Sequence, residues 1–389
     1  MPKHRKKGIL FLYLKSGGGH LSAARTLSGA ISEEYKDTIT PYLLNPIPKS
    51  AAVSNFLLQR GYRLSSHLFR CIWIFLYEIS KLKAVDFFCY FIIYRSIKKR
   101  CSRFLQEHET DTIVILHFLL TRPVKWVLRR KRKRDNRRQK RGGGGTSPTY
   151  RLIRIVTDPY TAHHAWFSMS GIPTIVFSEG LKRFAVEKFH FPPENVLAVP
   201  PMLDGKFHNP VPFGGMKNGG KKKTVLLVGG GEGLPGGIRF LKALLKSDLD
   251  FRILLVSGKD RRMRRKAEKL KNRFPSKSLA VFGFVNFLHE CMAAADVVVC
   301  KAGPAVIRES LATGTPVIII RYLYGQERGN MEYIIKNKLG YYAPTPQKMA
   351  ARLEEVMSDS KDWRFTVKRV KNWRVKNGTG LVVRECISH

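Results

Sequence analysis

Short runs of hydrophobic residues recur along the chain, and most of them end at a glycine or a polar turn. Stretches with helical periodicity, such as 21–31, 238–247 and 305–313, lie between many of these runs. Strands that are apolar on both faces and alternate with helices are typical of a parallel sheet covered on each side. The pattern therefore predicts an α/β fold. Its expected strands lie within 8–14, 112–118, 151–158, 174–178, 224–231, 251–258, 295–303 and 315–322.

The alternation pauses before residue 224, in a segment where proline, glycine and lysine predominate. Such a composition is typical of a domain boundary. A chain of 389 residues also suits two domains of ordinary size. We therefore expect Rossmann-like domains at 1–205 and 224–365, joined by a linker at 206–223 and followed by a basic helix at 366–389.

Residues 129–147 form a second interruption, in which lysine and arginine dominate before a run of glycines. Like charges at this density do not pack against one another, so we expect a mobile, solvated loop. A basic run can bind nucleic acid, act as a nuclear signal, or hold an enzyme against anionic lipid. Because this run lies inside a domain, we favour a basic insert that decorates an enzyme.

The most apolar region is 71–94, but Glu78, Lys81, Lys83 and Asp86 interrupt it. A membrane-spanning helix needs about twenty largely uncharged residues, so we predict none here. The charges fall between aromatic clusters, which favours amphipathic helices with one apolar face. That face either packs in the core or rests on lipid, and the sequence leaves both interpretations open.

The formal net charge of +41 changes the picture, because it is extreme for a globular α/β protein. It indicates attraction to nucleic acid, an anionic membrane surface or phosphorylated ligands. Six scattered cysteines form no C-x-x-C pair, which argues against a zinc site or a disulfide scaffold and favours a reducing compartment. The basic leader lacks a small-residue cleavage site, so we expect the apolar run after it to be the first strand and not a signal peptide.

The first strand is followed by three glycines, Gly17 to Gly19, and then by His20. A glycine-rich turn between strand and helix lets a ligand approach the bare backbone at a helix N-terminus. That signal alone is weak, because dinucleotide-binding domains share it. The imidazole at the helix entrance is in a position to take a proton. The alternative is that His20 only caps or packs the helix.

The second half repeats this arrangement. Gly229, Gly230 and Gly231 follow an apolar strand, and Glu232 follows them. A later strand ends at Cys300, and Pro304 is a favoured first residue for the next helix, whose free N–H groups can receive a diphosphate. A carboxylate within that helix can accept hydrogen bonds from two ribose hydroxyls. The glutamine and glutamate of "GQERGN" come after the next strand, where open α/β sheets usually contact ligands.

Four stretches carry a resemblance to a known family: "SGGGHLSAA", "VTDPYTAHHAWF", "VGGGEG" and the segment from "GFVNFLHE" to "GQERGN". They resemble the glycosyltransferases that make monogalactosyldiacylglycerol and glucosyl-diacylglycerols. This branch of family 28-type enzymes also includes the transferase that adds N-acetylglucosamine to the lipid-linked peptidoglycan precursor. The resemblance runs from about residue 10 to about residue 335 and covers most of the chain. It implies a GT-B fold, with two facing Rossmann-like domains and a cleft between them.

The resemblance also implies a UDP-sugar donor on the C-terminal half. The uracil is expected along 282–285, the ribose on Glu309, and the hexose hydroxyls at Gln326 and Glu327. The diphosphate is expected on the glycine loop and the turn at Gly303, although "GEGLPGG" departs from the family pattern and leaves the geometry of that loop open. The donor-binding residues implied in this way are Gly229, Gly230, Gly231, Glu232, Phe282, Gly283, Phe284, Val285, Lys301, Gly303, Pro304, Glu309, Gln326, Glu327 and Asn330.

On the acceptor side, His20 matches the proposed base of the family. Asp158 is the second candidate, or it orients an imidazole, or it is only a turn-forming residue before Pro159. Trp166 is as consistent with a core aromatic residue as with a lipid contact. His163 and His164 are adjacent, so at most one of them faces the acceptor. The acceptor-binding residues implied by the resemblance are Gly18, Gly19, His163 and Trp166.

These features favour an inverting transfer of galactose or glucose from a UDP-sugar to diacylglycerol. One base suffices for a single displacement, and helix N-termini with lysines can stabilise the leaving UDP, so neither a cofactor nor a metal site is predicted. We expect a peripheral membrane protein on a reducing side, such as a plastid envelope or a cytoplasmic membrane face. Three alternatives stay open: a polyprenyl-linked or sterol acceptor, a nucleic-acid-binding protein without an apparent recognition module, and a non-catalytic scaffold that binds UDP-sugars.

Overall fold

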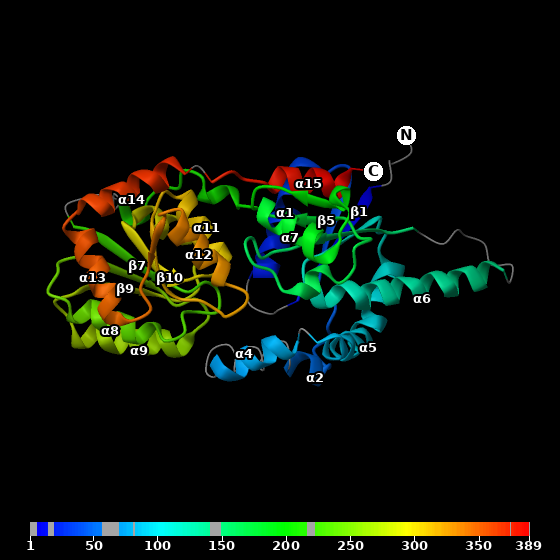
Figure 1. Cartoon of the computed structure of the whole chain (residues 1–389), viewed down its shortest axis with the longest axis horizontal. Coiled ribbons are helices and arrows are strands. Elements are labelled where there is room, and N and C mark those ends of the chain that lie inside the picture. Colours follow the sequence, from blue (N-terminus) through cyan, green and yellow to red (C-terminus); the bar gives the residue numbers. More distant parts are fainter. Residues whose placement is uncertain are drawn as a thin grey trace. The chain divides into compact units, whose positions relative to one another are not determined.

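The structure is a computed structural model that describes residues 6–14, 19–56, 70–80, 82–140, 149–215, 222–373 and 375–388. The chain divides into two compact units, each built around a six-stranded sheet (Figure 1). The first unit contains Met1–Met202 together with Asn377–His389, and the second contains Leu203–Lys376. Each unit is a layered α/β structure, as the alternation of apolar runs and helices predicts.

The sheet of the first unit has the strand order β2-β1-β3-β4-β5-β6, and every pair is parallel. Strand β1 lies inside the sheet, where Leu10 pairs with Tyr42 on one side and Ile113 on the other. Its residues are buried from Gly8 onwards, because helices cover both faces. The strands are β1 (Lys7–Leu12), β2 (Ile39–Leu44), β3 (Thr112–Ile115), β4 (Arg151–Ile155), β5 (Thr174–Val176) and β6 (Val196–Ala198).

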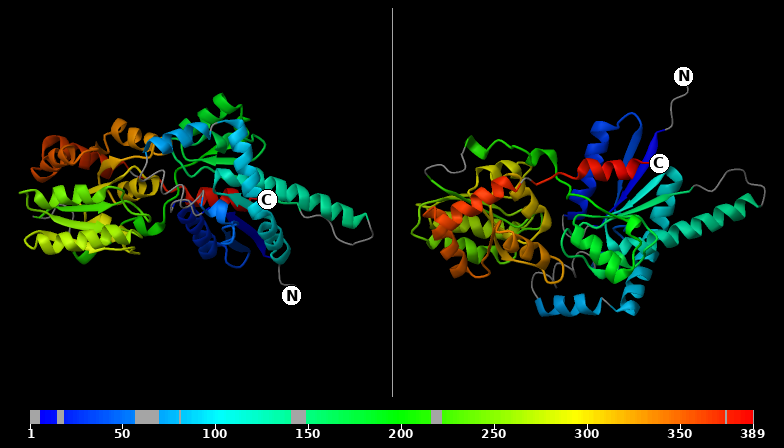
Figure 2. Two further views of the ribbon diagram at one scale, coloured as in Figure 1. Left: turned by 90° about the horizontal axis from the view of Figure 1, so that it is seen from below. Right: turned by 45° about the horizontal axis from the view of Figure 1, so that its top comes forward.

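Two groups of helices enclose this first sheet. Buried residues of α1 and α15 form one core with alternate residues of β1, β3 and β4, and α5 and α6 form the core on the opposite face (Figure 2). The helices are α1 (Gly19–Glu34), α2 (Ala52–Asn55), α4 (Arg70–Ile79), α5 (Lys83–Glu107), α6 (Thr121–Gln139), α7 (Glu179–Phe189) and α15 (Thr379–Ile387). Short 3₁₀ turns are η2 (Phe118–Leu120), η3 (His164–Phe167) and η4 (Pro193–Asn195).

The sheet of the second unit has the order β12-β11-β10-β7-β8-β9, again with all pairs parallel. Read along the chain, this is the order of doubly wound nucleotide-binding folds. The strands are β7 (Thr224–Val228), β8 (Arg252–Val256), β9 (Ser278–Phe282), β10 (Val297–Lys301), β11 (Val317–Arg321) and β12 (Gly340–Tyr342). The predicted pair of Rossmann-like parallel sheets is therefore confirmed, while the predicted cleft between the domains stays a prediction.

Helices cover both faces of the second sheet as well. Buried residues of α8, α9 and α13 pack on one face, and those of α10, α11 and α12 pack on the other. The helix α14 contributes Trp363 to the first of these cores and Val370 to the second. The helices are α8 (Gly237–Lys246), α9 (Arg261–Arg273), α10 (Leu288–Ala294), α11 (Pro304–Ala312), α12 (Arg328–Lys336), α13 (Pro346–Met357) and α14 (Lys361–Asn372), with 3₁₀ turns η5 (Gly205–Phe207) and η6 (Phe213–Gly215).

The ends of the units differ from the expected boundaries. The segment 206–223 does not begin as a free linker, because Phe207 is buried in the second unit and Phe213 stacks on Phe287 there. The expected basic helix at 366–389 is instead two helices in different units, α14 and α15. They are separated near Gly378, whose N–H donates to the Pro201 carbonyl at 3.0 Å.

The basic insert also differs from the expected loop. Residues 129–139 continue the helix α6, which packs against α5 through its apolar first turns, and 141–148 lie outside the described residues. Lys131 is almost buried and pairs with Asp135 one turn later at 3.0 Å. The like charges that argue against packing are solvated on the exposed face of a helix, so the backbone remains regular. No helix within the described residues is both long and apolar enough to cross a bilayer.

Candidate active site

In the first unit, candidate catalytic residues gather at the carboxyl edge of the sheet. Strands β1, β3 and β4 are neighbours, and His20, His117 and Thr157 follow these three strands. The strand order reverses between β1 and β3, and ligands of open α/β sheets bind at such a switch point. His20 and His117 therefore flank the position in this unit where a ligand is expected.

His20 is the second residue of α1 and is partly buried. Its Nδ1 lies 3.1 Å from Thr157 Oγ1, and its ring centroid lies 4.6 Å from that of His117. Burial lowers the pKa of His20 from 6.5 to about 4, while a hydrogen bond with the Leu116 backbone acts in the opposite direction. A histidine with that pKa is neutral at pH 7, so its ring has a lone pair that can accept a proton.

His117 is a buried neighbour that the sequence analysis missed. Its side chain is 4% exposed, and its Nδ1 accepts a hydrogen bond from the Leu119 N–H at 3.2 Å. Burial lowers the pKa of His117 well below 6.5, and the nearby His20 and His163 lower it further. The signal was present in the sequence, because the apolar run 112–118 contains one ionisable residue at its carboxyl end.

His163 and His164 connect this edge of the sheet to α4 and α5. The Ala165 N–H donates to His163 Nδ1 at 3.2 Å, which leaves the ring proton on Nε2, 2.9 Å from Ser80 Oγ. His164 Nε2 lies 3.5 Å from Asp86 Oδ2. The sequence predicts that His163 contacts the acceptor. The structure instead buries His163 and engages both of its ring nitrogens within the chain.

The other predicted acceptor-side residues are also placed by the first unit. Trp166 is fully buried in a core cluster, and its Nε1 donates to Asp158 Oδ2 at 3.3 Å. The indole is therefore a core aromatic that holds the candidate carboxylate, and of the two interpretations left open by the sequence the structure favours core packing over a lipid contact. Gly19 is the exposed first residue of α1, and Gly18 lies outside the described residues.

Arg154 ties the loop that carries these residues to the sheet. This fully buried side chain on β4 donates from Nε to Thr174 Oγ1 at 3.1 Å and from Nη2 to the Met169 carbonyl at 2.6 Å. Its Nη1 donates to the Trp166 carbonyl. Burial lowers the pKa of Arg154 to about 9. Since three acceptors surround the guanidinium, it fixes the turn η3 and, through Trp166, the carboxylate of Asp158.

In the second unit, the predicted diphosphate loop lies at the switch point between β7 and β10. A Cβ at Gly229 would lie 2.1 Å from the Gly233 carbonyl oxygen, so only glycine fits this close backbone approach. Gly230 has a φ of +80°, a conformation that glycine adopts without strain. Gly231 and Glu232 complete the turn and are partly buried. The loop thus exposes backbone beside the start of α11, as a phosphate site requires.

Lys301 and Glu327 form an ion pair beside this loop. Lys301 ends β10, and its Nζ contacts Glu327 Oε1, while the Leu323 N–H donates to Glu327 Oε2 at 2.9 Å. Both oxygens of Glu327 therefore have partners within the chain, and the side chain is 7% exposed. Glu327 is predicted to bind hexose hydroxyls. In this structure it instead orients Lys301 and the loop after β11.

Asn330 and Gly303 lie next to this pair. Asn330 is buried on α12, and its Nδ2 donates to the Ala302 carbonyl at 2.9 Å, while its Oδ1 has no hydrogen-bond partner within the described chain. Gly303 is the N-cap of α11 without a side-chain cap, and Pro304 is the first helical residue. The first N–H groups of α11 are thus available to an anion. Gln326 is partly buried in the turn before α12.

The predicted uridine contacts surround the same edge. Phe282 ends β9, and its carbonyl accepts hydrogen bonds from both the N–H and the Oγ of Ser257. Phe284 is 64% exposed, while Gly283 and Val285 are partly buried. Burial raises the pKa of Glu309, which is partly buried on α11. The single Asp-x-Asp triplet, 248–250, precedes β8 at the opposite edge of the sheet and does not join this group.

Solved structures show the class of fold. MurG from Acinetobacter baumannii is similar with a TM-score of 0.58 and 13% identity, over 98% of this chain and 100% of that one. The UDP-GlcNAc 2-epimerase from Neisseria meningitidis, bound to UDP-GlcNAc, is similar with a TM-score of 0.60 and 9% identity, over 99% of this chain and 100% of that one. The chain therefore has the GT-B fold. At these identities the likeness shows the fold alone, and the reaction stays open.

Sequence comparisons narrow the class. Residues 226–370 match the glycosyltransferase family 28 C-terminal domain. The probable monogalactosyldiacylglycerol synthase, chloroplastic, of Nicotiana tabacum is 26% identical over 373 residues, which cover 88% of this chain and 63% of that protein. Monogalactosyldiacylglycerol synthase 1, chloroplastic, of Arabidopsis thaliana is 25% identical, and the match covers 89% of this chain and 64% of that protein. Residues 226–370 thus match this family domain, and most of the chain is similar to these synthases, as the motifs predict. The chain spans less than two thirds of the length of either synthase.

Proposed function

We propose that this chain transfers a hexosyl group, galactosyl or glucosyl, from a UDP-sugar to the free hydroxyl of diacylglycerol with inversion at the anomeric carbon. The observation that carries the proposal is the pair of switch-point sites. One has a neutral imidazole at the carboxyl edge of its sheet, and the other has a glycine turn, a lysine and a helix N-terminus. The matched family domain and the named synthases support the same reaction.

In the proposed reaction, His20 accepts the proton of the acceptor hydroxyl. The hydroxyl oxygen forms a bond to the anomeric carbon while the bond from that carbon to the diphosphate oxygen breaks. The electron pair of the broken bond leaves with UDP. For Nε2 of His20 to act as the base, Nδ1 must carry the ring proton and donate it to Thr157 Oγ1, which lies 3.1 Å away. Thr157 is therefore a positioning residue, and Asp158 is the second candidate base.

The second unit is proposed to stabilise the leaving group. UDP gains negative charge as it departs, and the backbone N–H groups of 229–232, the N-terminus of α11 and Lys301 are suited to that charge. Glu327 holds Lys301 in place. Glu309 is proposed to accept from the ribose hydroxyls and Phe284 to lie against the uracil, because one is a partly buried carboxylate and the other an exposed ring. Gln326 is proposed to contact the hexose.

The test is incubation of the purified chain with UDP-galactose or UDP-glucose and vesicles that contain diacylglycerol, followed by analysis of the product lipid. We expect a monoglycosyldiacylglycerol whose anomeric proton shows the β configuration. The His20→Ala variant is expected to lose product at least about 100-fold, as removal of a general base does, while its dissociation constant for UDP stays unchanged. A product with retained configuration, or turnover without His20, contradicts the mechanism. UDP-sugar binding without any lipid product contradicts the proposed function and favours the alternative of a non-catalytic scaffold that binds UDP-sugars.

We also propose that the first unit rests on an anionic membrane surface. Helices α2, α4 and α5 and the residues that flank them expose large hydrophobic side chains, and α6, which packs on α5, exposes a cluster of cations. Apolar side chains enter the lipid interface, and each nearby cation adds about 1 kcal/mol at an anionic surface. The exposed apolar residues are Val53, Phe56, Phe75, Leu82, Phe87, Phe88 and Phe91, and the cations are Arg129, Arg130, Arg132, Lys133, Arg134 and Arg137.

Co-sedimentation with vesicles tests this surface. Phe88→Ser removes a ring that is 63% exposed on α5, and Phe365→Ser is a matched control on α14, where the ring is 50% exposed. Burying one Phe in an apolar phase contributes about 1.5–3 kcal/mol, so the first variant is expected to bind vesicles about tenfold or more weakly. The control is expected to bind as the unmodified chain does. Equal binding by both variants, or no preference for anionic over neutral vesicles, contradicts the proposed surface.

A further inference from the structure

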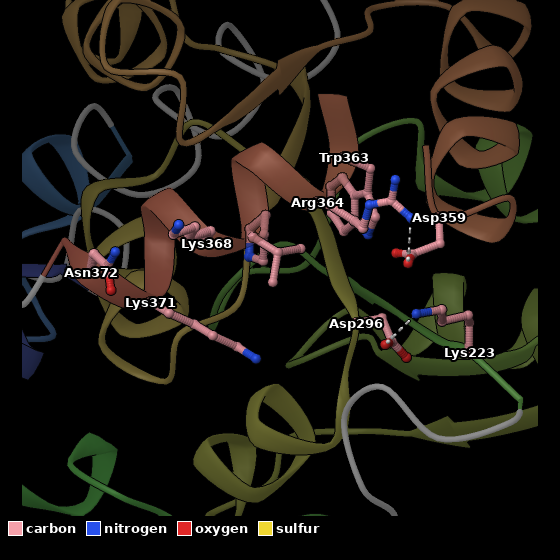
Figure 3. Close-up of a pocket in the computed structure, with 10 residues that line it drawn as sticks. Lys223, Asp296, Asp359, Trp363, Arg364, Lys368, Lys371 and Asn372 are labelled. Atoms are coloured by element: carbon pink, nitrogen blue, oxygen red, sulfur yellow. Dashed lines mark ion pairs between the residues drawn. The ribbon is translucent and has the colours of Figure 1, made fainter. Parts of the chain in front are cut away.

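A separate cavity lies at the opposite edge of the second sheet. Its volume is about 430 Å³, and Lys223, Asp296 and Pro316 line it directly before β7, β10 and β11 (Figure 3). The helix α14 forms the facing wall with residues between 363 and 372. The glycine loop and Lys301 follow the same strands at their carboxyl ends. The cavity and the candidate donor site are therefore different sites of the unit, separated by the length of the sheet.

Cations dominate the walls of this cavity. Arg364, Lys368 and Lys371 repeat along α14 at spacings of four and three residues, so they share one face of the helix. Neither lysine has an ion-pair or hydrogen-bond partner for its side chain within the described part of the chain, and Figure 3 shows that neither reaches a carboxylate. Like charges one turn apart repel and slightly destabilise a helix, and an anion bound between them would offset that repulsion. The repeat therefore favours a bound anion.

The acidic groups of the cavity are already engaged. Asp296 is 4% exposed, and its Oδ2 accepts from the Thr224 N–H at 2.8 Å, while its Oδ1 lies 3.6 Å from Lys223 Nζ. Asp359 lies 3.8 Å from Arg364 on the rim. Two carboxylates thus face four cations, and the carboxylate deeper in the wall is held by a strand N–H. The surplus positive charge lies on the α14 side of the cavity, where Arg364, Lys368 and Lys371 are exposed to solvent.

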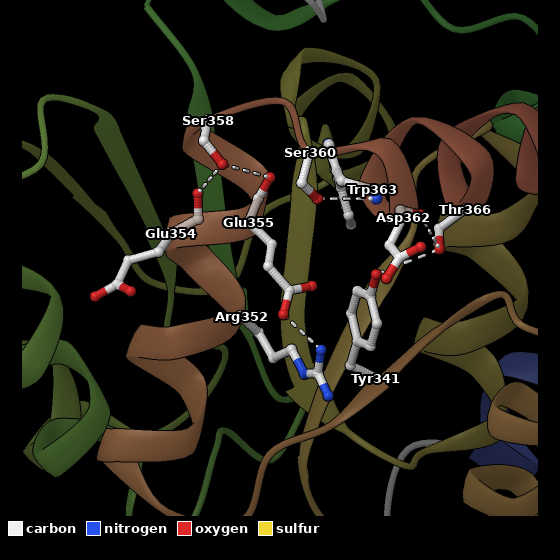
Figure 4. A network of polar contacts seen from close by, with 9 residues as sticks. All are labelled: Tyr341, Arg352, Glu354, Glu355, Ser358, Ser360, Asp362, Trp363 and Thr366. Atoms are coloured by element: carbon white, nitrogen blue, oxygen red, sulfur yellow. Dashed lines mark hydrogen bonds and ion pairs between the residues drawn. The ribbon is translucent and has the colours of Figure 1, made fainter.

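The helix that bears these cations is firmly positioned. The Ser360 Oγ accepts from the Trp363 N–H at 3.2 Å, and Thr366 Oγ1 donates to the Asp362 carbonyl at 3.1 Å (Figure 4). Tyr341 OH lies 3.4 Å from Thr366 Oγ1. Trp363 is 1% exposed and fixes the helix to the core. Because α14 is anchored through Trp363, the backbone positions of the cations that line the cavity keep their spacing before a ligand arrives.

We propose that this cavity binds a phosphate monoester dianion. A dianion matches Lys368 and Lys371, whose side chains have no ion-pair or hydrogen-bond partner among the described residues, and Arg364 at the rim can offer a forked pair of donors. The apolar side chains of Pro316, Trp363 and Val367 also line the cavity, so the ester can carry a small organic group. The ligand is either a soluble phosphate ester or the headgroup of a phosphomonoester lipid, because both present the same dianion. The site is independent of the proposed transfer reaction.

Calorimetric titration of the full chain with inorganic phosphate tests the site, with sodium chloride keeping the ionic strength constant. We expect saturable binding, and we expect the Lys368→Ala/Lys371→Ala variant to raise the dissociation constant at least about tenfold, because it removes two charge-assisted contacts. The matched control is Lys266→Ala/Lys269→Ala on α9, which removes two exposed lysines at the same spacing outside the cavity. The control is expected to change the dissociation constant less than about twofold.

Two further probes distinguish the sources of the ligand. Glycerol 3-phosphate represents a soluble ester, and phosphatidylcholine vesicles with phosphatidate, compared with pure phosphatidylcholine, represent the lipid. The source is the one whose binding falls in the Lys368/Lys371 variant and not in the control. Thermal unfolding of both variants without ligand shows whether each is folded. Absence of saturable binding by every probe, or an equal loss in the two folded variants, overturns the proposal.

Discussion

The low pKa of His20 predicts an unusual dependence of activity on pH. In the test, the unmodified chain is assayed while the pH is lowered from 7.5 to 5.5. A base with a pKa of about 4 remains about 97% neutral at pH 5.5, whereas a histidine of ordinary pKa is only about 9% neutral there. The two cases differ about tenfold in the fraction of competent base. We therefore expect kcat/KM for the UDP-sugar to change little over this range and to fall only as pH approaches 4.

The assay measures initial rates of lipid product, with vesicle binding recorded at each pH so that loss of lipid contact is separated from loss of the base. Stability must be followed as well, because it depends on the same group. The folded-state pKa lies below the unfolded value of 6.5, so the folded chain binds fewer protons. The stability contribution is therefore present above pH 6.5 and is lost as pH falls from 6.5 towards 4, by up to about 3 kcal/mol. A half-maximal rate near pH 6.5, in chain that is still folded and bound to vesicles, refutes the reasoning.

Three substitutions test the groups around the two candidate sites. Thr157→Val keeps the shape but removes the partner of His20 Nδ1, so kcat should fall about tenfold with KM unchanged, and an equal rate excludes the positioning role. Arg154→Met leaves three acceptors without a donor and should lower the free energy of unfolding, measured in urea, by about 3 kcal/mol. A loss below about 1 kcal/mol contradicts the role of Arg154 in fixing the turn η3. Gly229→Ala places a Cβ 2.1 Å from a backbone oxygen and should weaken UDP binding at least about tenfold. Gly231→Ala is its control, because a Cβ there meets nothing within 4 Å, and similar UDP affinity in both variants contradicts the loop assignment.

The interior of both sheets was predictable from hydrophobic runs. The expected strands correspond to β1, β3, β4, β5, β7, β8, β10 and β11, and each of these lies between two other strands. The strands without such a run are β2, β6, β9 and β12, which are the four edges. An edge strand is buried less completely and tolerates polar residues and proline, such as Pro41 in β2. Runs of hydrophobic residues therefore identify the interior strands, which are buried on both faces, and they miss the edge strands, which are less buried.

The candidate site was predictable in its glycines and carboxyl-edge residues, but not in its supporting contacts. Composition and motifs do not indicate that Trp166 donates to Asp158, because that contact depends on how the loop between β4 and β5 folds back on itself. They also do not indicate that Lys301 pairs with Glu327, because Lys301 ends β10 and Glu327 follows a different strand, β11. His117 was hidden in a run that was interpreted as purely hydrophobic. The helical course of 129–139 was missed because charge density outweighed the apolar first turns of α6. Motifs locate such a site, and tertiary packing decides which atoms remain available to a ligand.

The return of the C-terminal residues to the first unit has a consequence for synthesis. The helix α15 packs against α1 and β3, and Arg151 pairs with Glu385 at 2.7 Å. The first unit therefore stays incomplete until α15, which follows the second unit in the sequence, has been synthesised. The second unit, Leu203–Lys376, is one continuous segment, so it can fold before α15 is available to complete the first unit. A chain that stops before Thr379 would leave the apolar surface of α1 and the sheet uncovered. Truncation at this end would consequently favour aggregation of the nascent first unit, far along the sequence from the missing residues.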